Sequence, residues 1–302
     1  MKTVKEIEGF IEQSRRIDAH VHTHLCDGKP EMTIENIARE AESKGFDSII
    51  LTPHFHKKVT DGERELYEDS DESIFLSLRE EIDAYSKNCG KVRVLLSCEA
   101  DILTLDGETS LEISNVAERA LDAVTLTMNY HPLLPLKFVG LTMGKYIDEL
   151  IESGEYNEAA MRLGGVERVL QTMYECEISA IEKCQYPSIL GHFFAAHSVH
   201  PDKYTWFGAG REHLPMMMEY SARIIDACKK KGTLIDLTGV HMKTDTVAEK
   251  MAKNGFMVDF QRYVANECKN KGVYALYGSD AHSLASIGNA YDYYKELFGE
   301  DK

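Results

Sequence analysis

The chain has 302 residues, of which 43% are hydrophobic and 28% are charged, a balance typical of a protein with a packed core. Lys and Arg total 34 against 50 Asp and Glu, which gives a formal net charge of -16, and no basic block offsets it locally. Such a surface repels phosphate backbones and argues against nucleic acid as a partner, whereas a small anionic substrate is compatible with a pocket that contains bound cations.

The N-terminal segment and the cysteines predict a cytoplasmic protein. Residues 1–16 alternate in charge and lack the apolar stretch of a signal peptide, and no apolar run approaches the length of a membrane span. Seven cysteines occur at irregular spacing without a CxxC pair, which favours reduced thiols over a disulfide framework. We therefore expect neither a membrane partner nor disulfide bonds.

Short β-rich runs alternate with helical patterns along the chain. The predicted strands are Ile17–His20, Asp47–Thr52, Val92–Cys98, Asp122–Thr127, Ser188–Gly191, Thr233–Thr238 and Val273–Gly278. Amphipathic helices are expected between them, such as Leu214–Lys231 and Thr33–Lys44, in which Thr33 begins the helix and Gly45 ends it. This alternation favours parallel βαβ units, and the length favours a (β/α) barrel over an open sheet, which the pattern leaves as an alternative.

A single domain over residues 1–302 is expected, because no linker, low-complexity tract or short repeat divides the sequence. The segment from about residue 133 to 184 is longer than an ordinary connection, and its pattern predicts a helical insertion that covers or borders one face. A second long stretch, Phe193–His213, is rich in His, Gly and aromatic residues and is predicted to be an active-site loop.

Each predicted strand leads into side chains that can bind a metal ion. In barrel folds the active site lies at the C-terminal ends of the strands, so these side chains should converge. In chain order the candidates are His20, His22, His24 and Asp27, then His54 and His56, Glu99, His131, His192, His241, and finally Asp280 and His282. Imidazole and carboxylate ligands suit Zn, Mn or Fe, and their number implies two or three divalent ions. Such ions activate water and clamp the oxygens of a displaced phosphate.

The ordered motifs resemble those of the polymerase and histidinol phosphatase (PHP) family. The resemblance lies in DAHVHTHLCDG, TPH, the Glu of CEAD, the isolated histidines of NYHP and LGH, and the closing GSDAH. It extends over nearly the whole chain, and GSDAHSLASIG and CEADIL are most similar to the histidinol-phosphatase-type enzymes. It implies a distorted seven-stranded (β/α) barrel, similar to a TIM barrel, that holds a trinuclear metal site.

The resemblance also implies how the ligands divide among the ions. One ion would be held by His20, His22, Glu99 and Asp280, a second by Glu99, His131 and His192, and a third by His54 and His282 with Asp27. It implies further that a hydroxide bridging the ions attacks phosphorus. The expected activity is thus hydrolysis of a small phosphomonoester, with histidinol phosphate as the leading substrate, and the predicted catalytic groups are Asp280, His282 and His241.

Two departures from the family pattern leave the substrate open. The second motif is usually Asp-His, whereas this chain has Pro53 before His54, which resembles the PHP-type protein-tyrosine phosphatases of bacterial capsule systems. After the sixth strand the histidinol phosphatases are expected to offer a phosphate-binding Arg. This chain has His241 and Lys243 there, and Arg211, before the next helix, is the alternative substrate-binding group.

Five further histidines are not among the predicted metal ligands or catalytic groups. His24 and His56 each stand two residues from a better ligand and are predicted to support the site or to face solvent, while His197, His200 and His213 belong either to the pocket or to a surface loop. The competing functions are a protein-tyrosine phosphatase or phosphodiesterase of the same family, an amidohydrolase-like hydrolase, and a non-catalytic metal-binding domain of the kind attached to DNA polymerases. The isolated Glu99 and the SDAH ending favour phosphoester hydrolysis over the amidohydrolase, and the retained ligand positions argue against a degenerate site.

Overall fold

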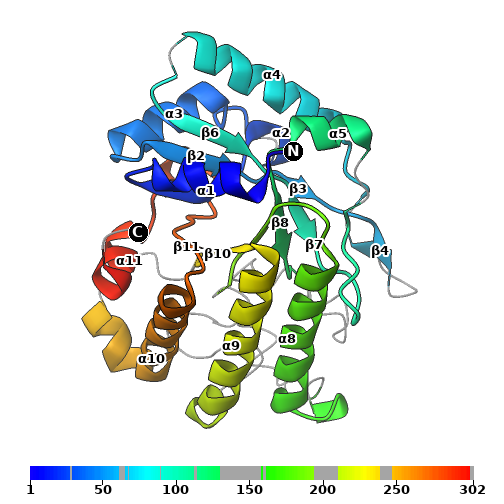
Figure 1. Cartoon of the computed structure of the whole chain (residues 1–302), viewed down its shortest axis with the longest axis vertical. Helices are drawn as coiled ribbons and strands as arrows, with labels where there is room; N and C mark the ends of the chain where they lie inside the picture. Colours follow the sequence, from blue (N-terminus) through cyan, green and yellow to red (C-terminus); the bar gives the residue numbers. More distant parts are fainter. Residues whose placement is uncertain are drawn as a thin grey trace.

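Parallel strands and the helices between them form the part of the chain that the computed structural model describes (Figure 1). The described residues are 1–27, 29–60, 65–66, 68–88, 90–111, 114–129, 158, 161–193, 210–238 and 247–299. Within these ranges the side chains of residues 27, 59, 65, 66, 116 and 247–254 are left out.

All seven predicted strands lie within a strand of the structure or contain one. The strands are β1 (Ile17–Val21), β2 (Ser48–Leu51), β3 (His54–Phe55), β4 (Val59–Thr60), β5 (Glu65–Leu66), β6 (Arg93–Leu96), β7 (Glu99–Asp101), β8 (Val124–Thr127), β9 (Ser188–Leu190), β10 (Leu234–Asp236) and β11 (Ala275–Leu276). The prediction of an α/β fold with parallel sheets is confirmed.

The strands form two parallel sheets and one small antiparallel pair. The first sheet has the order β1-β2-β6, the second has the order β11-β10-β9-β8-β7-β3, and β4 pairs with β5. The chain passes from the first sheet to the second twice, from β2 into β3 and from β6 into β7. Because β3 pairs with β7 through His54 and Glu99, both crossings deliver a candidate ligand to the same place.

Hydrogen bonds also join the two sheets at the strands farthest apart in the sequence. The Ala19 amide of β1 donates to the Tyr277 carbonyl at 2.8 Å, just after β11, and the His22 amide donates to the Ala281 carbonyl at 3.0 Å. On the other side of the first sheet, the Asp122 amide donates to the Leu96 carbonyl at the end of β6 at 2.7 Å.

Helices cover the sheets on the outside (Figure 1). They are α1 (Val4–Glu12), α2 (His24–Asp27), α3 (Ile34–Ser43), α4 (Ser73–Asn88), α5 (Asn115–Ala120), α8 (Val166–Lys183), α9 (Leu214–Lys231), α10 (Val247–Lys271) and α11 (Tyr291–Phe298). The predicted helix 214–231 has the observed bounds of α9, and α8 falls in the predicted insertion, of which residues 133–157 and 159–160 lie outside the described part.

Helix α3 shows why the sequence pattern located its ends. The Thr33 hydroxyl accepts a hydrogen bond from the Asn36 amide, which satisfies a backbone donor that the first turn leaves open. Gly45, just past the helix, has φ +82°, a left-handed conformation that glycine adopts without steric cost.

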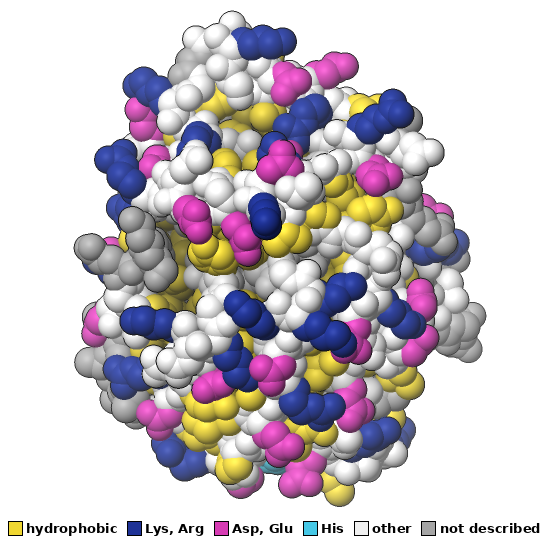
Figure 2. All heavy atoms as spheres, viewed as in Figure 1, with side chains coloured by type: hydrophobic (Ala, Val, Ile, Leu, Met, Phe, Trp, Pro, Cys, Tyr) yellow, Lys and Arg dark blue, Asp and Glu magenta, His cyan; other side chains and the backbone are white. Residues whose placement is uncertain are grey.

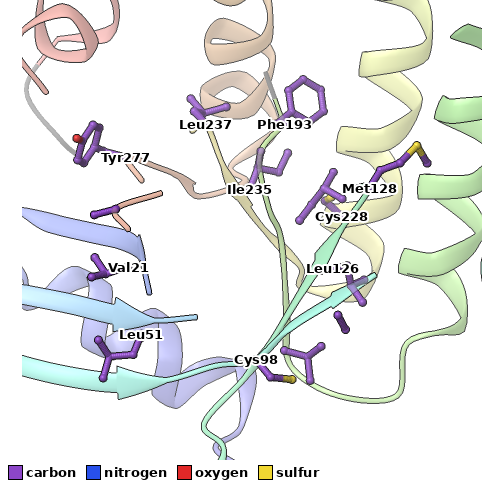
Figure 3. Close-up of a cluster of buried hydrophobic side chains, with 14 of the residues drawn as sticks. Val21, Leu51, Cys98, Leu126, Met128, Phe193, Cys228, Ile235, Leu237 and Tyr277 are labelled. Atoms are coloured by element: carbon purple, nitrogen blue, oxygen red, sulfur yellow. The ribbon is translucent and has the colours of Figure 1, made fainter. Parts of the chain in front are cut away.

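Two separate groups of buried apolar side chains stabilise this arrangement. The larger one packs the sheets against the outer helices, and Figure 3 shows members of it from both sheets, including Val21, Leu51, Leu126 and Ile235. The smaller one takes residues from all seven predicted strands together with two from α1: Ile7, Ile11, Ile17, Ala19, Ile50, Leu95, Ala123, Ile189, Leu234 and Leu276. The strands therefore share an apolar interior of their own, which α1 covers at one end.

The surface drawn in Figure 2 mixes acidic and basic side chains with apolar ones, and histidine is almost absent from that face. Several of the described histidines are instead buried in the centre of the fold. None of the helices in the described ranges combines the length and the apolar character that crossing a bilayer requires.

Candidate metal centre

Seven of the predicted ligands meet at the C-terminal ends of the strands. They are His20 and His22 from the end of β1, His54 from β3, Glu99 from β7, His192 after β9, and Asp280 and His282 after β11. We call these seven residues the ligand cluster. Three overlapping groups within it have ligand atoms within 4.8 Å of one another: His22, His54 and His282; His20, His192 and Asp280; and His20, His22 and Glu99. An arrangement of this kind suits more than one ion.

Asp280 faces four imidazoles through a single carboxylate oxygen. Its Oδ1 lies 3.0 Å from Nε2 of His22 and 3.2 Å from Nε2 of His282. The Nε2 atoms of His20 and His192 are 3.7 Å and 3.8 Å away. Burial alone would raise the pKa of Asp280, but the imidazoles of His192, His22 and His282 that face it hold that pKa well below its usual range.

Glu99, in β7, faces three of the same imidazoles and is completely buried. Its Oε2 lies 3.0 Å from Nδ1 of His54, 3.4 Å from Nε2 of His22 and 3.5 Å from Nε2 of His20. Its Oε1 lies 3.4 Å from Nε2 of His192. Burial alone would raise the pKa of Glu99, but the facing imidazoles of His54 and His192 hold it well below the ordinary value. The carboxylate is thus ionised and faces imidazoles in two directions, as a ligand that bridges two ions must.

Several buried nitrogen and oxygen atoms of the ligand cluster lack hydrogen-bond partners among the described residues and are suited to binding cations. Nε2 of His20, Oε2 of Glu99 and Nε2 of His192 are buried without a hydrogen-bond partner among the described residues, an expensive arrangement unless a ligand completes it. Burial lowers the pKa of His22 to about 3, so its imidazole is neutral, the form in which histidine binds a metal ion. Nitrogen and oxygen donors without a thiolate suit Zn, Mn or Fe.

Strained backbone carries two members of the ligand cluster. His192 and Asp280 have φ values of 51° and 50°, in the left-handed region that non-glycine residues rarely adopt. A side chain on the preceding Gly191 would approach the methyl groups of Thr125 and Thr127 at 2.6 Å and 2.7 Å, so this position has no room for a Cβ. Strain of this kind, held by the surrounding packing, occurs frequently at functional sites.

A buried aspartate of β10, absent from the predicted site, holds His20 and His192 in place. Asp236 Oδ2 accepts a hydrogen bond from Nδ1 of His20 at 2.9 Å and one from the His192 amide at 3.3 Å. Its Oδ1 accepts bonds from the amide of Thr238, at 2.8 Å, and from its hydroxyl. With its Nδ1 bonded to Asp236, the His20 ring turns Nε2 toward Glu99 and Asp280, the orientation in which a neutral imidazole of this tautomer binds a metal ion.

A second polar network supports Glu99 from the side of β7 and β8. The Asn129 amide donates to Oε1 of Glu99 and to Oδ1 of Asp101, both at 2.8 Å. The other oxygen of Asp101 lies 2.7 Å from Nδ1 of His56, whose ring stacks on that of His54 at a centroid distance of 4.6 Å. His56 therefore adjoins the ligand cluster and contacts a carboxylate behind it, in agreement with its predicted supporting position.

The remaining predicted residues lie away from the ligand cluster or outside the described part. His24 contacts the Met32 carbonyl at 3.3 Å and Glu81 of α4 at 3.3 Å. His213 accepts a hydrogen bond from the Gly210 amide, and Arg211 pairs with Asp259 of α10 at 3.8 Å, with 66% of its side chain exposed. The residues His131, His197, His200, His241 and Lys243 lie outside the described residues, as does the side chain of Asp27.

A cavity elsewhere in the fold contains no member of the ligand cluster. It has a volume of about 670 Å³ and lies where α1, α10 and α11 meet β11, with Ile11, Tyr274, Leu276 and Phe298 among its lining residues. Its walls are mostly apolar and hold no group of imidazoles or carboxylates. The candidate active site is therefore the ligand cluster and not this cavity.

Three comparisons with known proteins agree with this geometry. The family model of the PHP domain matches residues 18–280. The histidinol-phosphatase of Bacillus subtilis (strain 168) is 24% identical over 289 residues, which cover 92% of this chain and 98% of that protein.

Two solved structures share the fold. The histidinol phosphate phosphatase of Lactococcus lactis subsp. lactis Il1403, complexed with Zn, L-histidinol and phosphate, aligns with a TM-score of 0.56 at 13% identity and covers 94% of each chain. The putative histidinol phosphatase of Listeria monocytogenes aligns with a TM-score of 0.58 at 16% identity, over 92% of this chain and 100% of the other. Since the family model covers most of the chain and includes six of the seven residues of the ligand cluster, the chain belongs to the PHP domain family.

Proposed function

We propose that this protein is a metal-dependent phosphatase that hydrolyses a small phosphomonoester, with histidinol phosphate as the leading substrate. The observation that carries the proposal is the ligand cluster, in which five imidazoles and two buried carboxylates converge from strands of both sheets. A histidinol-phosphatase covers 92% of this chain, and a histidinol phosphate phosphatase complexed with Zn, L-histidinol and phosphate covers 94% of it.

The protein's own residues prepare the site for this chemistry. Asp236 fixes the His20 tautomer, and Asn129 donates to one oxygen of Glu99 while the other oxygen faces His54. When bound, the ions act as Lewis acids that activate water and offset the negative charge on the phosphate oxygens. Asp280 and His282 remain our proposed catalytic groups, and His282, with 40% of its side chain exposed, lies toward the open side of the ligand cluster.

We also propose that the strands close into a distorted seven-stranded barrel within a single domain. The hydrogen bonds between β1 and the segment after β11 support closure, because they link the first strand to the last. The smaller apolar group supports it as well, since every predicted strand contributes a residue to one shared interior. A reduced, cytoplasmic environment agrees with the described cysteines, none of which forms a disulfide: Cys26, Cys98, Cys176, Cys184, Cys228 and Cys268.

A panel of phosphate esters tests the proposed activity. Protein loaded with Zn, Mn or Fe is assayed for phosphate release from histidinol phosphate, a sugar phosphate, a phosphotyrosine peptide, a nucleotide and a phosphodiester. We expect turnover of histidinol phosphate to exceed that of the others and to disappear with a chelator or in the His22→Ala variant. Faster release from the phosphotyrosine peptide or the diester would assign the protein to another branch of the family, and no release at all would refute the proposal.

A further inference from the structure

Lys29 lies at the rim of the ligand cluster and contacts it through the backbone. It follows α2 in sequence, and its ammonium group donates a hydrogen bond to the carbonyl oxygen of His282. The imidazole of the same residue is bonded to Asp280 and stacks on the ring of His22 at a centroid distance of 3.9 Å. The ammonium group is therefore anchored beside the imidazole that is the most exposed of the ligand cluster.

The charge of Lys29 is unbalanced, although the chain has an excess of acidic residues. The side chain is half-buried, and the bond to His282 is its one interaction within the described part of the chain. Two other half-buried cations have carboxylate partners: Arg79 contacts Asp122 at 2.7 Å, and Lys271 contacts Asp226 at 2.7 Å. An ammonium group has three donors, so Lys29 keeps donors for an anion after it has bound the carbonyl.

Lys44 offers a comparison, because it contacts the same segment after β11 as Lys29 does. Its ammonium group donates to the carbonyls of Ala285 and Ile287, at 2.9 Å and 2.7 Å, and thus also anchors the segment that follows β11. Unlike Lys29, it is paired with a carboxylate, that of Glu40 at 3.2 Å. Anchoring this loop therefore does not require an unpaired charge, and the unpaired charge of Lys29 calls for a separate explanation.

We propose that Lys29 is a substrate-binding residue that holds the phosphate group of the ester against the ligand cluster. Its ammonium group donates to a phosphate oxygen that does not bridge to the leaving group, while the carbonyl of His282 keeps the side chain in position. This inference rests on the proposed phosphatase function. It gives Lys29 the phosphate-binding role for which the sequence had suggested Arg211, a residue that the structure pairs with Asp259. Lysine recognises phosphate as a point charge and is widely used for that purpose.

Binding of inorganic phosphate to the metal-loaded protein tests the inference independently of turnover. Titration calorimetry compares the native chain with Lys29→Met, Lys29→Arg and Lys44→Met, each checked for metal content and melting temperature. Loss of one charge-assisted hydrogen bond should weaken phosphate binding in Lys29→Met by about 10-fold or more, with metal content unchanged. Lys29→Arg should retain most of the affinity, and Lys44→Met should lower only the melting temperature.

Kinetics then separate binding from chemistry. On the best ester of the panel, Lys29→Met should raise KM by about the same factor as it raises the dissociation constant of phosphate. Unchanged phosphate binding in Lys29→Met, or equal weakening in Lys44→Met, would overturn the inference, the second by assigning the effect to loop anchoring. If Lys29→Met does not fold, Lys29→Gln takes its place, and unchanged phosphate binding in that variant would overturn the inference. If the native protein hydrolyses no ester, the proposed function fails, while the phosphate titration still decides whether Lys29 binds the anion.

Discussion

At the scale of single residues, the ligand cluster depends on side chains that are not themselves ligands. Asp236 links β1 to β9 by bonding both the His20 ring and the His192 amide. Without its carboxylate, the proton of His20 could move to Nε2 and remove the lone pair that a metal ion requires. Carboxylates that orient metal-binding histidines in this way commonly change metal affinity by about 10- to 100-fold.

We therefore expect Asp236→Asn to weaken zinc binding by about 10- to 100-fold, because the amide cannot replace both acceptor oxygens. Competition with a chromophoric chelator measures the affinity. The matched control is Asp226→Asn, which removes a carboxylate of α9 that bonds Lys271 at the surface and should leave zinc binding unchanged. Equal affinities for Asp236→Asn and the native protein would show that the tautomer of His20 is fixed by other contacts.

The sequence predicted the ligand cluster better than its supports. The seven clustered residues stand at strand ends, where a polar residue after an apolar run is a strong signal. Asp236 stands inside the predicted strand 233–238, and its one signal was a carboxylate within an otherwise apolar run. Asn129 and Asp101 gave no signal of their own, because their positions depend on how β7 and β8 lie against each other.

At the scale of elements, the seven strands were predictable while the short continuations of two of them were not. β3 and β7 have two and three residues, and each follows a break in a longer apolar run. Their existence depends on pairing with each other across the sheet, through His54 and Glu99, and no local pattern encodes such a contact. Helix ends were better defined, since capping is a local interaction.

The N-cap of α3 provides a test of that local interaction. Thr33→Ala removes the side-chain acceptor of the Asn36 amide and should lower the free energy of unfolding by about 1 kcal/mol. Urea denaturation measures the change. Thr33→Ser keeps the hydroxyl and should stay within a few tenths of a kcal/mol of the native value, so an equal loss in both variants would assign the effect to the methyl group of Thr33.

The interface of α8 with α9 contains a buried carboxyl whose ionisation opposes folding. Burial raises the pKa of Glu177 from 4.5 to about 8, so the folded protein holds this proton more tightly than the unfolded chain does. Stability from this group is present below pH 4.5, decreases as the pH rises toward about 8, and is lost above that value.

Glu177→Gln should remove this dependence. We expect the variant to gain stability relative to the native protein as the pH rises from 5 to 9, by on the order of several kcal/mol at the upper end. Denaturant titrations at several pH values measure the difference. A constant difference between the two proteins across this range would mean that Glu177 ionises in the fold as readily as in water.

At the scale of the whole molecule, the ligand cluster joins the two sheets. His20 belongs to the first sheet and His22 directly follows its strand β1, while Glu99 and His54 belong to the second sheet. An ion bound among them therefore holds both sheets together, and its binding free energy adds to the stability of the entire fold. The sequence anticipated the α/β class from the alternation of elements, but it did not show the division into two sheets, which depends on contacts between distant strands.

Metal removal should consequently lower the global melting temperature. Free zinc at 100 times its dissociation constant contributes about 2.7 kcal/mol to stability, provided that the unfolded chain does not bind it. Calorimetric melting with zinc, with a chelator and after zinc is restored should show a reversible shift. His22→Ala should show a much smaller one, and an equal shift in this variant would place the stabilising ion elsewhere.

Residues from the beginning and from the last part of the chain meet in the ligand cluster, and this has a consequence for biosynthesis. His22 and Asp280, in hydrogen-bond contact, are 258 positions apart in the sequence. While the chain is being made from its N-terminus, most strands can emerge and pair before the last ligands leave the ribosome. A nascent or C-terminally truncated chain thus cannot assemble a complete metal-binding centre, and metal loading follows the completion of synthesis.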